Sequence, residues 1–242
     1  MIGAGGYTFP LRLVRDLLAF ESAQDATFAL TDIDPVGLER TRRLTERLID
    51  GHGLTTRVAA SLDRRAMLRD ADVVLVTFQV GGLEAYRHDV EIPRRYGIDQ
   101  TVGDTLGPGG VFRGLRTGFV LEAIAADMQE LCPDALLIQY ANPMAINCRL
   151  TADLGIRTVG LCHSVQGTSR TLARILGIED RQWTFRCAGI NHQAWFTHFA
   201  CDGVDATAEL LDPLTAAVLP LERIHAMVEE LLAAEAAWLP QL

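Results

Sequence analysis

The chain of 242 residues lacks the features of membrane, secreted and nucleic-acid-binding proteins. No apolar run approaches the roughly 20 residues that span a bilayer. The opening residues, Met1–Gly6, contain neither the basic stretch nor the apolar block of a secretory signal. Lysine and arginine total 22 against 31 aspartates and glutamates, and this net charge of −9 disfavours nucleic acid and anionic lipid as partners. We therefore expect a cytoplasmic protein that binds neither membrane nor nucleic acid.

Paired cysteines are also missing. The five cysteines form no C-x-x-C motif, and their odd number fits reduced thiols better than a disulfide framework. The remaining composition is that of an ordinary globular protein, with 49% apolar residues, 9 prolines and 21 glycines. The length suffices for one large domain with a small appendage.

What the sequence does contain is an alternation of strand and helix patterns. Val73–Phe78 is apolar without alternation, which is typical of a strand covered on both faces. The strands are predicted at 26–31, 55–59, 73–78, 135–140 and 156–161, followed by paired strands within 183–199. The helices are predicted at 11–20, 35–50, 64–70, 84–96, 115–131 and 164–176, with another after Pro143. This order predicts an α/β fold with a doubly wound, Rossmann-like parallel sheet. After Gly203 the composition changes, and an alanine- and glutamate-rich helix is predicted at 221–238.

Glycines dominate the segment Gly3–Gly6 before the first predicted helix, and Asp32 closes the next strand. In dinucleotide sites such glycines let the backbone approach a pyrophosphate, and the acid accepts hydrogen bonds from the ribose. Thr8 stands where the third glycine of that fingerprint falls, and most of the usual first strand is absent before the loop. The pattern indicates an NAD site, with a plain glycine turn and a capping aspartate as the alternative.

A second glycine-rich segment, Gly103–Gly110, precedes Arg113. It is too rich in glycine for a plain connection between helices. Asp104 and Arg113 could present charge to a polar ligand from a loop at the carboxyl edge of the sheet. A solvated turn with a helix cap is the competing interpretation, and the segment alone favours it.

Polar and metal-binding side chains follow several predicted strands. Asn142, Cys162 and His192 each come directly after such a strand. Because the ends of parallel strands meet at one edge, these residues could come together there. A thiolate and an imidazole could hold a divalent transition metal and leave positions open for substrate oxygens. On spacing alone, a buried cysteine and a core histidine explain the same residues.

Taken together, these motifs resemble glycoside hydrolase family 4, the NAD- and manganese-dependent glycosidases, and most of all its α-galactosidase branch. The run from Gly160 to Thr168, Gly-Leu-Cys-His-Ser-Val-Gln-Gly-Thr, is typical of that branch. The matching segments are Ile2–Gly5, Asp32–Pro35, Gly103–Arg113, Tyr140–Met144, Gly160–Thr168 and Cys187–Gln193. The resemblance runs from Met1 to about Phe199. It implies that residues 1–202 form an NAD-binding Rossmann-like domain with a metal site, and that 203–242 form a C-terminal helical segment.

The resemblance implies a reaction by redox-assisted elimination in place of the usual pair of carboxylates. NAD⁺ takes hydride from C3 of the sugar, a base removes the C2 proton, and the aglycone leaves from C1 before water adds. The metal acts as a Lewis acid, and the cofactor carries the hydride chemistry. The same resemblance assigns the site residues. The NAD site comprises Gly3, Gly5, Gly6 and Asp32, and the metal ligands are Cys162 and His192. The catalytic residues are His163, Asn142 and Asp104, and the substrate-binding residues are Arg87, Asn142 and Asn191.

Members of this family are considerably longer than 242 residues. The tail after Leu211 resembles their extreme C-terminus, so the sequence joins their N-terminal half to their last helices between Cys201 and Leu210. The skipped region supplies the C2 base and much of the oligomer interface. Two explanations of this junction stay open: the chain is a minimal form of the family's proteins, or the given sequence omits residues that the molecule contains. The sequence also leaves open three functions: an α-galactosidase-like glycosidase, which we expect to be a homo-oligomer; a non-catalytic NAD-binding oligomerising module; and a hydroxyacid dehydrogenase of the lactate/malate-like fold.

Overall fold

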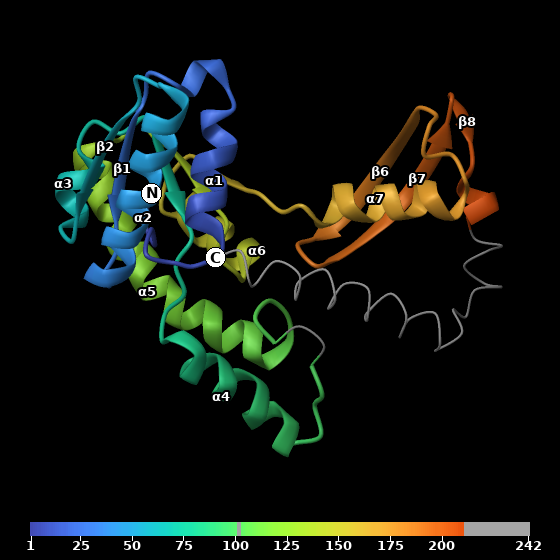
Figure 1. The fold of residues 1–242 in the computed structure, drawn as a ribbon. Coiled ribbons are helices and arrows are strands. Elements are labelled where there is room, and N and C mark those ends of the chain that lie inside the picture. The colour runs from blue at the N-terminus through green and yellow to red at the C-terminus, as the bar shows by residue number, and fades with distance from the viewer. Residues whose placement is uncertain (101–102, 211–242) are drawn as a thin grey trace, which may run out of the picture. The chain divides into compact units, whose positions relative to one another are not determined.

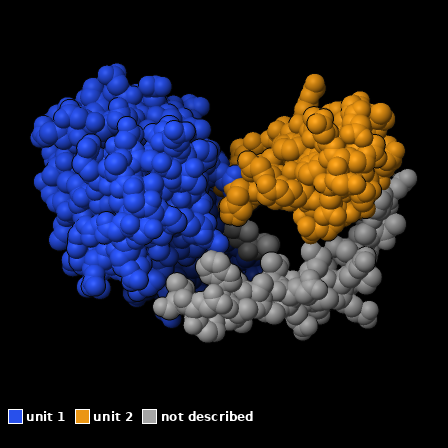
Figure 2. Space-filling model, turned by 45° about the horizontal axis from the view of Figure 1, so that its top comes forward, with its two compact units in different colours: residues 1–162 blue, residues 163–242 orange. Residues whose placement is uncertain are grey.

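The computed structural model describes residues 1–100 and 103–210 and divides the chain into two compact units, 1–162 and 163–242 (Figure 2). The resemblance implies a boundary after residue 202, and that position lies inside the second unit. The boundary falls earlier because the residues after 162 share a hydrophobic core of their own, which includes Leu172, Ala173 and Phe199. The helix expected at 221–238 lies outside the described residues.

The first unit is built on parallel strands. β1 (Thr27–Thr31) pairs with β2 (Arg57–Ser61), while β3 (Val73–Val76), β4 (Leu136–Gln139) and β5 (Thr158–Gly160) pair in that order (Figure 1). Ile2 connects the two groups, since it forms parallel bridges to both Thr31 and Val76. The resulting spatial order is β2-β1-Ile2-β3-β4-β5. The predicted α/β, Rossmann-like class is therefore confirmed.

Helices cover both faces of these strands. The helices of the first unit are α1 (Phe9–Leu18), α2 (Pro35–His52), α3 (Arg64–Leu68), α4 (Gly82–Arg95), α5 (Gly107–Leu131) and α6 (Met144–Asp153), with a short 3₁₀ turn at Glu21–Ala23. One core cluster joins Leu30 of β1 to Leu38 of α2. Another joins Val76 and Leu137 to Leu121 of α5. Val76 is aligned with Thr31 through Ile2, and consecutive strand residues point to opposite faces, so Leu30 and Val76 lie on opposite faces of the sheet. The two clusters therefore cover the two faces of the sheet.

The starts of two helices show how local sequence determines structure. Asp34 caps α2 by accepting hydrogen bonds from Val36 N (3.0 Å) and Gly37 N (3.1 Å), and proline follows it at the first helical position, as predicted. For α5, sequence patterns predict a start only at residue 115. The helix begins at Gly107, with Pro108 in its first turn. Part of the expected glycine loop is therefore helix. Although α5 has 25 residues, no helix within the described residues is long and apolar enough to cross a membrane.

The second unit contains α7 (Ser164–Ile175) and an antiparallel sheet. Its strands are β6 (Trp183–Ile190), β7 (Gln193–Cys201) and β8 (Val204–Asp205). The predicted strand pairing within 183–199 is thus confirmed. Phe196 lies between Phe185 and Phe199, with ring centroids 5.2 and 6.4 Å away.

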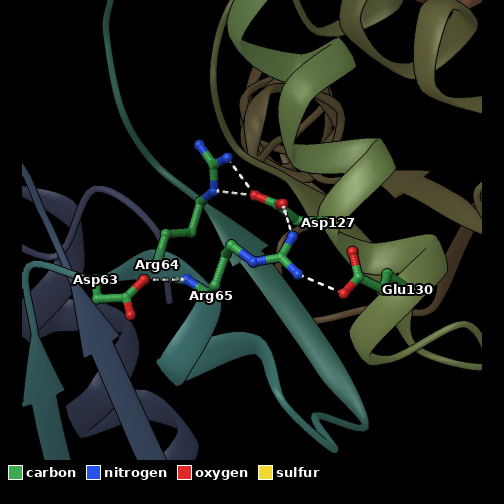
Figure 3. A network of polar contacts seen from close by, with 5 residues as sticks. All are labelled: Asp63, Arg64, Arg65, Asp127 and Glu130. Atoms are coloured by element: carbon green, nitrogen blue, oxygen red, sulfur yellow. Dashed lines mark hydrogen bonds and ion pairs between the residues drawn. The ribbon is translucent and has the colours of Figure 1, made fainter.

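Ion pairs hold α3 against α5 in the first unit (Figure 3). Asp127 of α5 accepts hydrogen bonds from both Arg64 and Arg65, and Arg65 also pairs with Glu130. Burial raises the pKa of Asp127, but the hydrogen bonds from Arg64 and Arg65 outweigh that effect and hold the pKa below its ordinary value. The network therefore stabilises the fold only while this carboxyl group is ionised.

We predict that Asp127→Asn lowers the free energy of unfolding at pH 7 by about 1–3 kcal/mol, since hydrogen bonds from two guanidinium groups are lost or weakened. A carboxyl pKa depressed in the folded state stabilises above the unfolded pKa, near 3.9, and ceases to do so as pH falls through the folded pKa. The difference from wild type should therefore shrink in urea titrations below about pH 4. Glu122→Gln, an exposed position on the same helix, is the matched control. A pH-independent difference would contradict the assignment.

Candidate functional site

The loop after Ile2 is pressed closely between two strand ends. Gly3 has φ of +89°, and a Cβ there would lie 2.6 Å from the backbone N of Phe78. Gly5 N donates a hydrogen bond of 2.6 Å to Asp32 Oδ2, and a Cβ on Gly5 would lie 2.8 Å from the carboxylate carbon. Both glycines are therefore required by close approach. The loop and Asp32 meet as the dinucleotide pattern predicts.

Helix α2 supports this loop from the other side. A Cβ on Gly37 would lie 2.6 Å from the carbonyl oxygen of Gly5, so the helix start touches the loop backbone. The guanidinium of Arg40 donates to the same carbonyl at 2.6 Å and lies 3.9 Å from the ring centroid of Tyr7. The second Asp32 oxygen accepts from Asp34 N at 2.9 Å. The carboxylate is thus fixed in orientation, with lone pairs left for the hydroxyl groups of a ligand.

A second group of polar residues lies where β4 ends. Asn142 Nδ2 donates to Asp104 Oδ2 at 2.9 Å, which joins two residues separated by 38 positions. Arg113 Nε donates to the backbone oxygen of Asn142 at 3.0 Å, and a cis peptide bond links Asn142 to Pro143. Burial lowers the pKa of Arg113 despite the neighbouring carboxylates of Asp104 and Asp89. The structure therefore unites two of the three predicted catalytic residues.

An ion pair beside this group was not predicted from the sequence. Asp89 of α4 binds the guanidinium of Arg116 on α5 through both oxygens, at 2.9 and 2.5 Å, and its side chain is only 3% exposed. Gln100 connects the pair to the glycine segment, since it donates to Asp89 O and accepts from Gly109 N, each at 2.9 Å. Recognising that α5 begins at Gly107 would have revealed the signal, because Arg113 and Arg116 then share one helix face.

Each of the remaining predicted site residues is described by the element that carries it. Arg87 is exposed on α4 and lies 3.8 Å from Glu91, one turn along the same helix. Cys162 ends the first unit, whereas His163 precedes α7 in the second. Asn191 and His192 form the turn between β6 and β7, where His192 has φ of +63°.

The expectation that His192 follows a strand of the parallel sheet is therefore wrong. It follows β6, which belongs to an antiparallel hairpin, so convergence of parallel strand ends does not apply to it. Among the described residues, no three His, Cys, Asp or Glu side chains lie close enough together to hold a metal ion. Within the same residues, Asn191 Oδ1 is buried without a hydrogen-bond partner.

A family model and several known proteins match most of this chain. A model of the family 4 glycosyl hydrolases matches residues 1–178. The chain belongs to glycosyl hydrolase family 4. The α-galactosidase of Bacillus subtilis (strain 168) is 42% identical over 211 residues, and that of Rhizobium meliloti (strain 1021) is 40% identical over 205. These alignments cover 86% and 84% of this chain but 49% and 42% of those proteins, so the family 4 chain spans less than half their length.

Among solved structures, a 6-phospho-α-glucosidase from gut microorganisms in complex with NAD and glucose-6-phosphate has a TM-score of 0.74 and 27% identity. The alignment covers 86% of this family 4 chain and 48% of that one. The similarity therefore supports the Rossmann-like architecture and its place within the family.

We predict that Asp89→Asn lowers the free energy of unfolding by about 2–4 kcal/mol, because it leaves the guanidinium of Arg116 without its counterion beside a buried face. Asp153→Asn is the matched control, since Asp153 pairs with Arg149 on an exposed helix surface and should cost below about 1 kcal/mol. Chemical denaturation measures both. Equal losses would mean that the Asp89–Arg116 pair behaves like a surface pair.

Proposed function

We propose that this chain is the cofactor-binding part of an α-galactosidase that works by NAD-dependent oxidation at C3, elimination and hydration. The observation that carries the proposal is the contact of Gly5 N with the Asp32 carboxylate at the end of β1. The two α-galactosidases at 40–42% identity support the choice of substrate class. An α-galactoside is therefore the substrate to test first.

The residues at the glycine loop fit NAD. Gly3 and Gly5 have no room for side chains, so no Cβ stands in the way where a pyrophosphate would approach the start of α1. Gly6 lies at the exposed end of this loop. Asp32, held by Gly5 N and Asp34 N, would accept the ribose hydroxyl groups and repel a 2′-phosphate. NAD, when bound, supplies the hydride acceptor for C3, and the NAD complex of the 27%-identical relative supports this choice.

The Asp104–Asn142 pair would hold the sugar. Asn142 donates to Asp104, so its carbonyl oxygen is directed by that hydrogen bond and can accept from hydroxyl groups next to C3. The desolvated guanidinium of Arg113 fixes the backbone of Asn142 in place. Arg87 and Asn191 would bind further sugar oxygens, and His163 would protonate the leaving oxygen at C1.

The donor chemistry of Cys162 and His192 suits a divalent transition metal such as Mn²⁺, with substrate oxygens completing the coordination. When bound, this ion would act as a Lewis acid beside the C2 and C3 oxygens. The protein's own contribution is to supply one sulfur and one nitrogen donor, each on a separate compact unit.

An exposed apolar face of α5 supports self-association of the chain. Val111, Leu115 and Phe119 are spaced four residues apart on one face of α5 and are 52%, 61% and 75% exposed. An apolar helix face of this kind favours burial against another chain. We therefore propose a homo-oligomer. The cytoplasmic location expected from the sequence stays a prediction.

The alternative function is a non-catalytic NAD-binding module that self-associates. It shares the glycine loop and Asp32 with the first proposal, so the two functions differ in whether the chain turns over a glycoside.

The first prediction from the proposal concerns the cofactor. Asp32→Ala should weaken NAD⁺ binding about 10- to 100-fold in calorimetric titration, because charge-assisted hydrogen bonds to the ribose are lost. Wild type should bind NADP⁺ more weakly than NAD⁺. Asp50→Ala, at the exposed far end of α2, should leave the affinity unchanged. Tighter binding of NADP⁺ by wild type would refute this role of Asp32.

The second concerns the metal. Cys162→Ser and His192→Ala should each weaken Mn²⁺ binding at least tenfold when free ion is measured by electron paramagnetic resonance, because each substitution leaves only one of the two protein donors. Cys187→Ser, which removes another half-buried thiol, is the control. If the control weakens binding equally, the ligands are assigned incorrectly.

The third separates the two functions. Purified chain of verified mass is incubated with an aryl α-galactoside, NAD⁺, Mn²⁺ and a reductant, and aglycone release and C2 proton exchange are followed. We expect NAD⁺ binding to be measurable whatever the rate of turnover, because the glycine loop and Asp32 lie together. Turnover at the rate of a full-length relative would show that this chain carries its own base. NAD⁺ binding with no release at all would favour the non-catalytic module.

A further inference from the structure

The three peptide oxygens that follow β4 are each held by a helix. Asn147, in the first turn of α6, donates from Nδ2 to Ala141 O at 3.0 Å and from its backbone N to Pro143 O at 2.9 Å. Between these two bonds, Arg113 Nε of α5 donates to Asn142 O at 3.0 Å. Asn147 therefore holds the backbone on both sides of Asn142, the residue proposed to bind the sugar.

Helix α6 approaches the sheet closely because β5 ends in glycine. A Cβ on Gly160 would lie 2.9 Å from Cys148 Sγ, so a larger residue there would push the helix away. Gly160 is paired in register with Gln139, the last residue of β4, and all of these residues belong to the first compact unit. The close approach brings the side chain of Asn147, next to Cys148, within reach of the backbone that leaves β4.

The side chain of Asn147 is fully buried, with an exposed fraction of 0%. Within the residues that the structure describes, its Oδ1 has no hydrogen-bond partner. A buried oxygen without a partner destabilises a folded protein, and leucine fills nearly the same space without one. Packing alone therefore does not call for asparagine here. What asparagine supplies, and leucine cannot, is the Nδ2 donor to Ala141 O.

We propose that Asn147 is a positioning residue for the sugar site and acts through Ala141. Because a peptide group is planar, the bond to Ala141 O also fixes the direction of the N–Cα bond of Asn142. Arg113 fixes the next peptide plane in the same way, so the Cβ of Asn142 has one direction. That direction places Asn142 Nδ2 2.9 Å from Asp104 Oδ2 and leaves the amide oxygen for the sugar. The inference rests on the proposed function, which makes Asn142 a sugar-binding residue.

The side-chain amide of Asn142 reports on this role directly. Asparagine occurs at positions 142, 147 and 191, so labelling asparagine with a heavy nitrogen isotope gives few side-chain signals in magnetic resonance spectra. Asp104→Ala removes the acceptor and should shift the Asn142 signals of the otherwise unchanged chain. In Asn147→Leu, the same substitution should shift them less than about half as far, because Asn142 no longer faces Asp104. Asn147→Ala, which adds no atoms to a buried position, should give the same result.

Thr151→Val is the matched control. Thr151 is also fully buried on α6, and its hydroxyl donates to Asn147 O at 2.9 Å, so this variant loses a buried hydrogen bond on the same helix. It leaves the Nδ2 donor of Asn147 in place, and the full shift caused by Asp104→Ala should be retained. A full shift in both Asn147 variants, or an equally reduced shift in Thr151→Val, would overturn the proposal.

Binding of a sugar separates this inference from the proposed function. With NAD⁺ and Mn²⁺ present, Asn147→Leu should weaken binding of methyl α-galactoside at least about tenfold relative to wild type, since a hydrogen bond in a buried site is lost. The affinity for NAD⁺ should not change, because Asp32 and α2 hold the glycine loop. An unchanged galactoside affinity beside altered Asn142 signals would overturn the role in sugar binding. If wild type binds no galactoside, the proposed function fails, while the Asn142 signals still decide whether Asn147 holds that residue.

Discussion

The hydrogen bonds of the Met1–Ala4 segment hold the first unit together. Ile2 N and O bond to Leu75 and Thr77, while Gly3 N and Ala4 N both donate to Thr31 O. One short stretch thus pairs with β1 on one side and β3 on the other, and without it the two groups of strands have no common neighbour. The same stretch leads directly into the glycine loop. The position of the proposed NAD site therefore depends on these few bonds.

The proposed sugar site depends on buried charge. Asp89 and Arg116 join α4 to α5, and Gln100 extends this contact to the start of α5. Burial of Arg113 next to Asn142 adds a second desolvated guanidinium at the same place. Charges of this kind contribute little to net stability compared with apolar packing, but they specify geometry because a misplaced partner is costly. The edge that holds Asn142 is accordingly built by ion pairs, whereas the NAD edge is built by close backbone packing.

Much of the fold could be predicted because its signals are local. Pro35 after a capping aspartate marks the start of α2, and the apolar run at 73–76 marks a covered strand. The beginning of α5 could not be read in the same way, because Gly109 and Gly110 have poor helix propensity. Glycine is nevertheless required at position 109, because a Cβ there would lie 2.6 Å from Asp89 O on α4. That is a tertiary constraint invisible in a window of sequence.

The candidate site was predictable in the same uneven manner. Gly5 and Asp32 carry a motif with a known mechanism, and they lie together. Asp104 was suggested by its glycine-rich segment and Asn142 by its place after a strand, and only their catalytic roles came from the resemblance. Their hydrogen bond confirms that they are neighbours. The prediction for His192 is wrong about the sheet that it follows. Two adjacent strand patterns do not reveal whether the two strands belong to the parallel sheet or form an antiparallel sheet of their own. Asp89 by itself looks like a surface acid in sequence, so the signal for its ion pair lies only in the arginines that share one face of α5.

The central claim is that NAD lies between the glycine loop and Asp32. Site-resolved amide hydrogen exchange with and without saturating NAD⁺ tests it most directly, since it reports on the loop amides themselves. The account predicts slower exchange at Gly5 and Gly6 and at the amides following Asp32, with little change in β6 and β7. Saturable NAD⁺ binding that leaves exchange in both of those loop segments unaltered would contradict it.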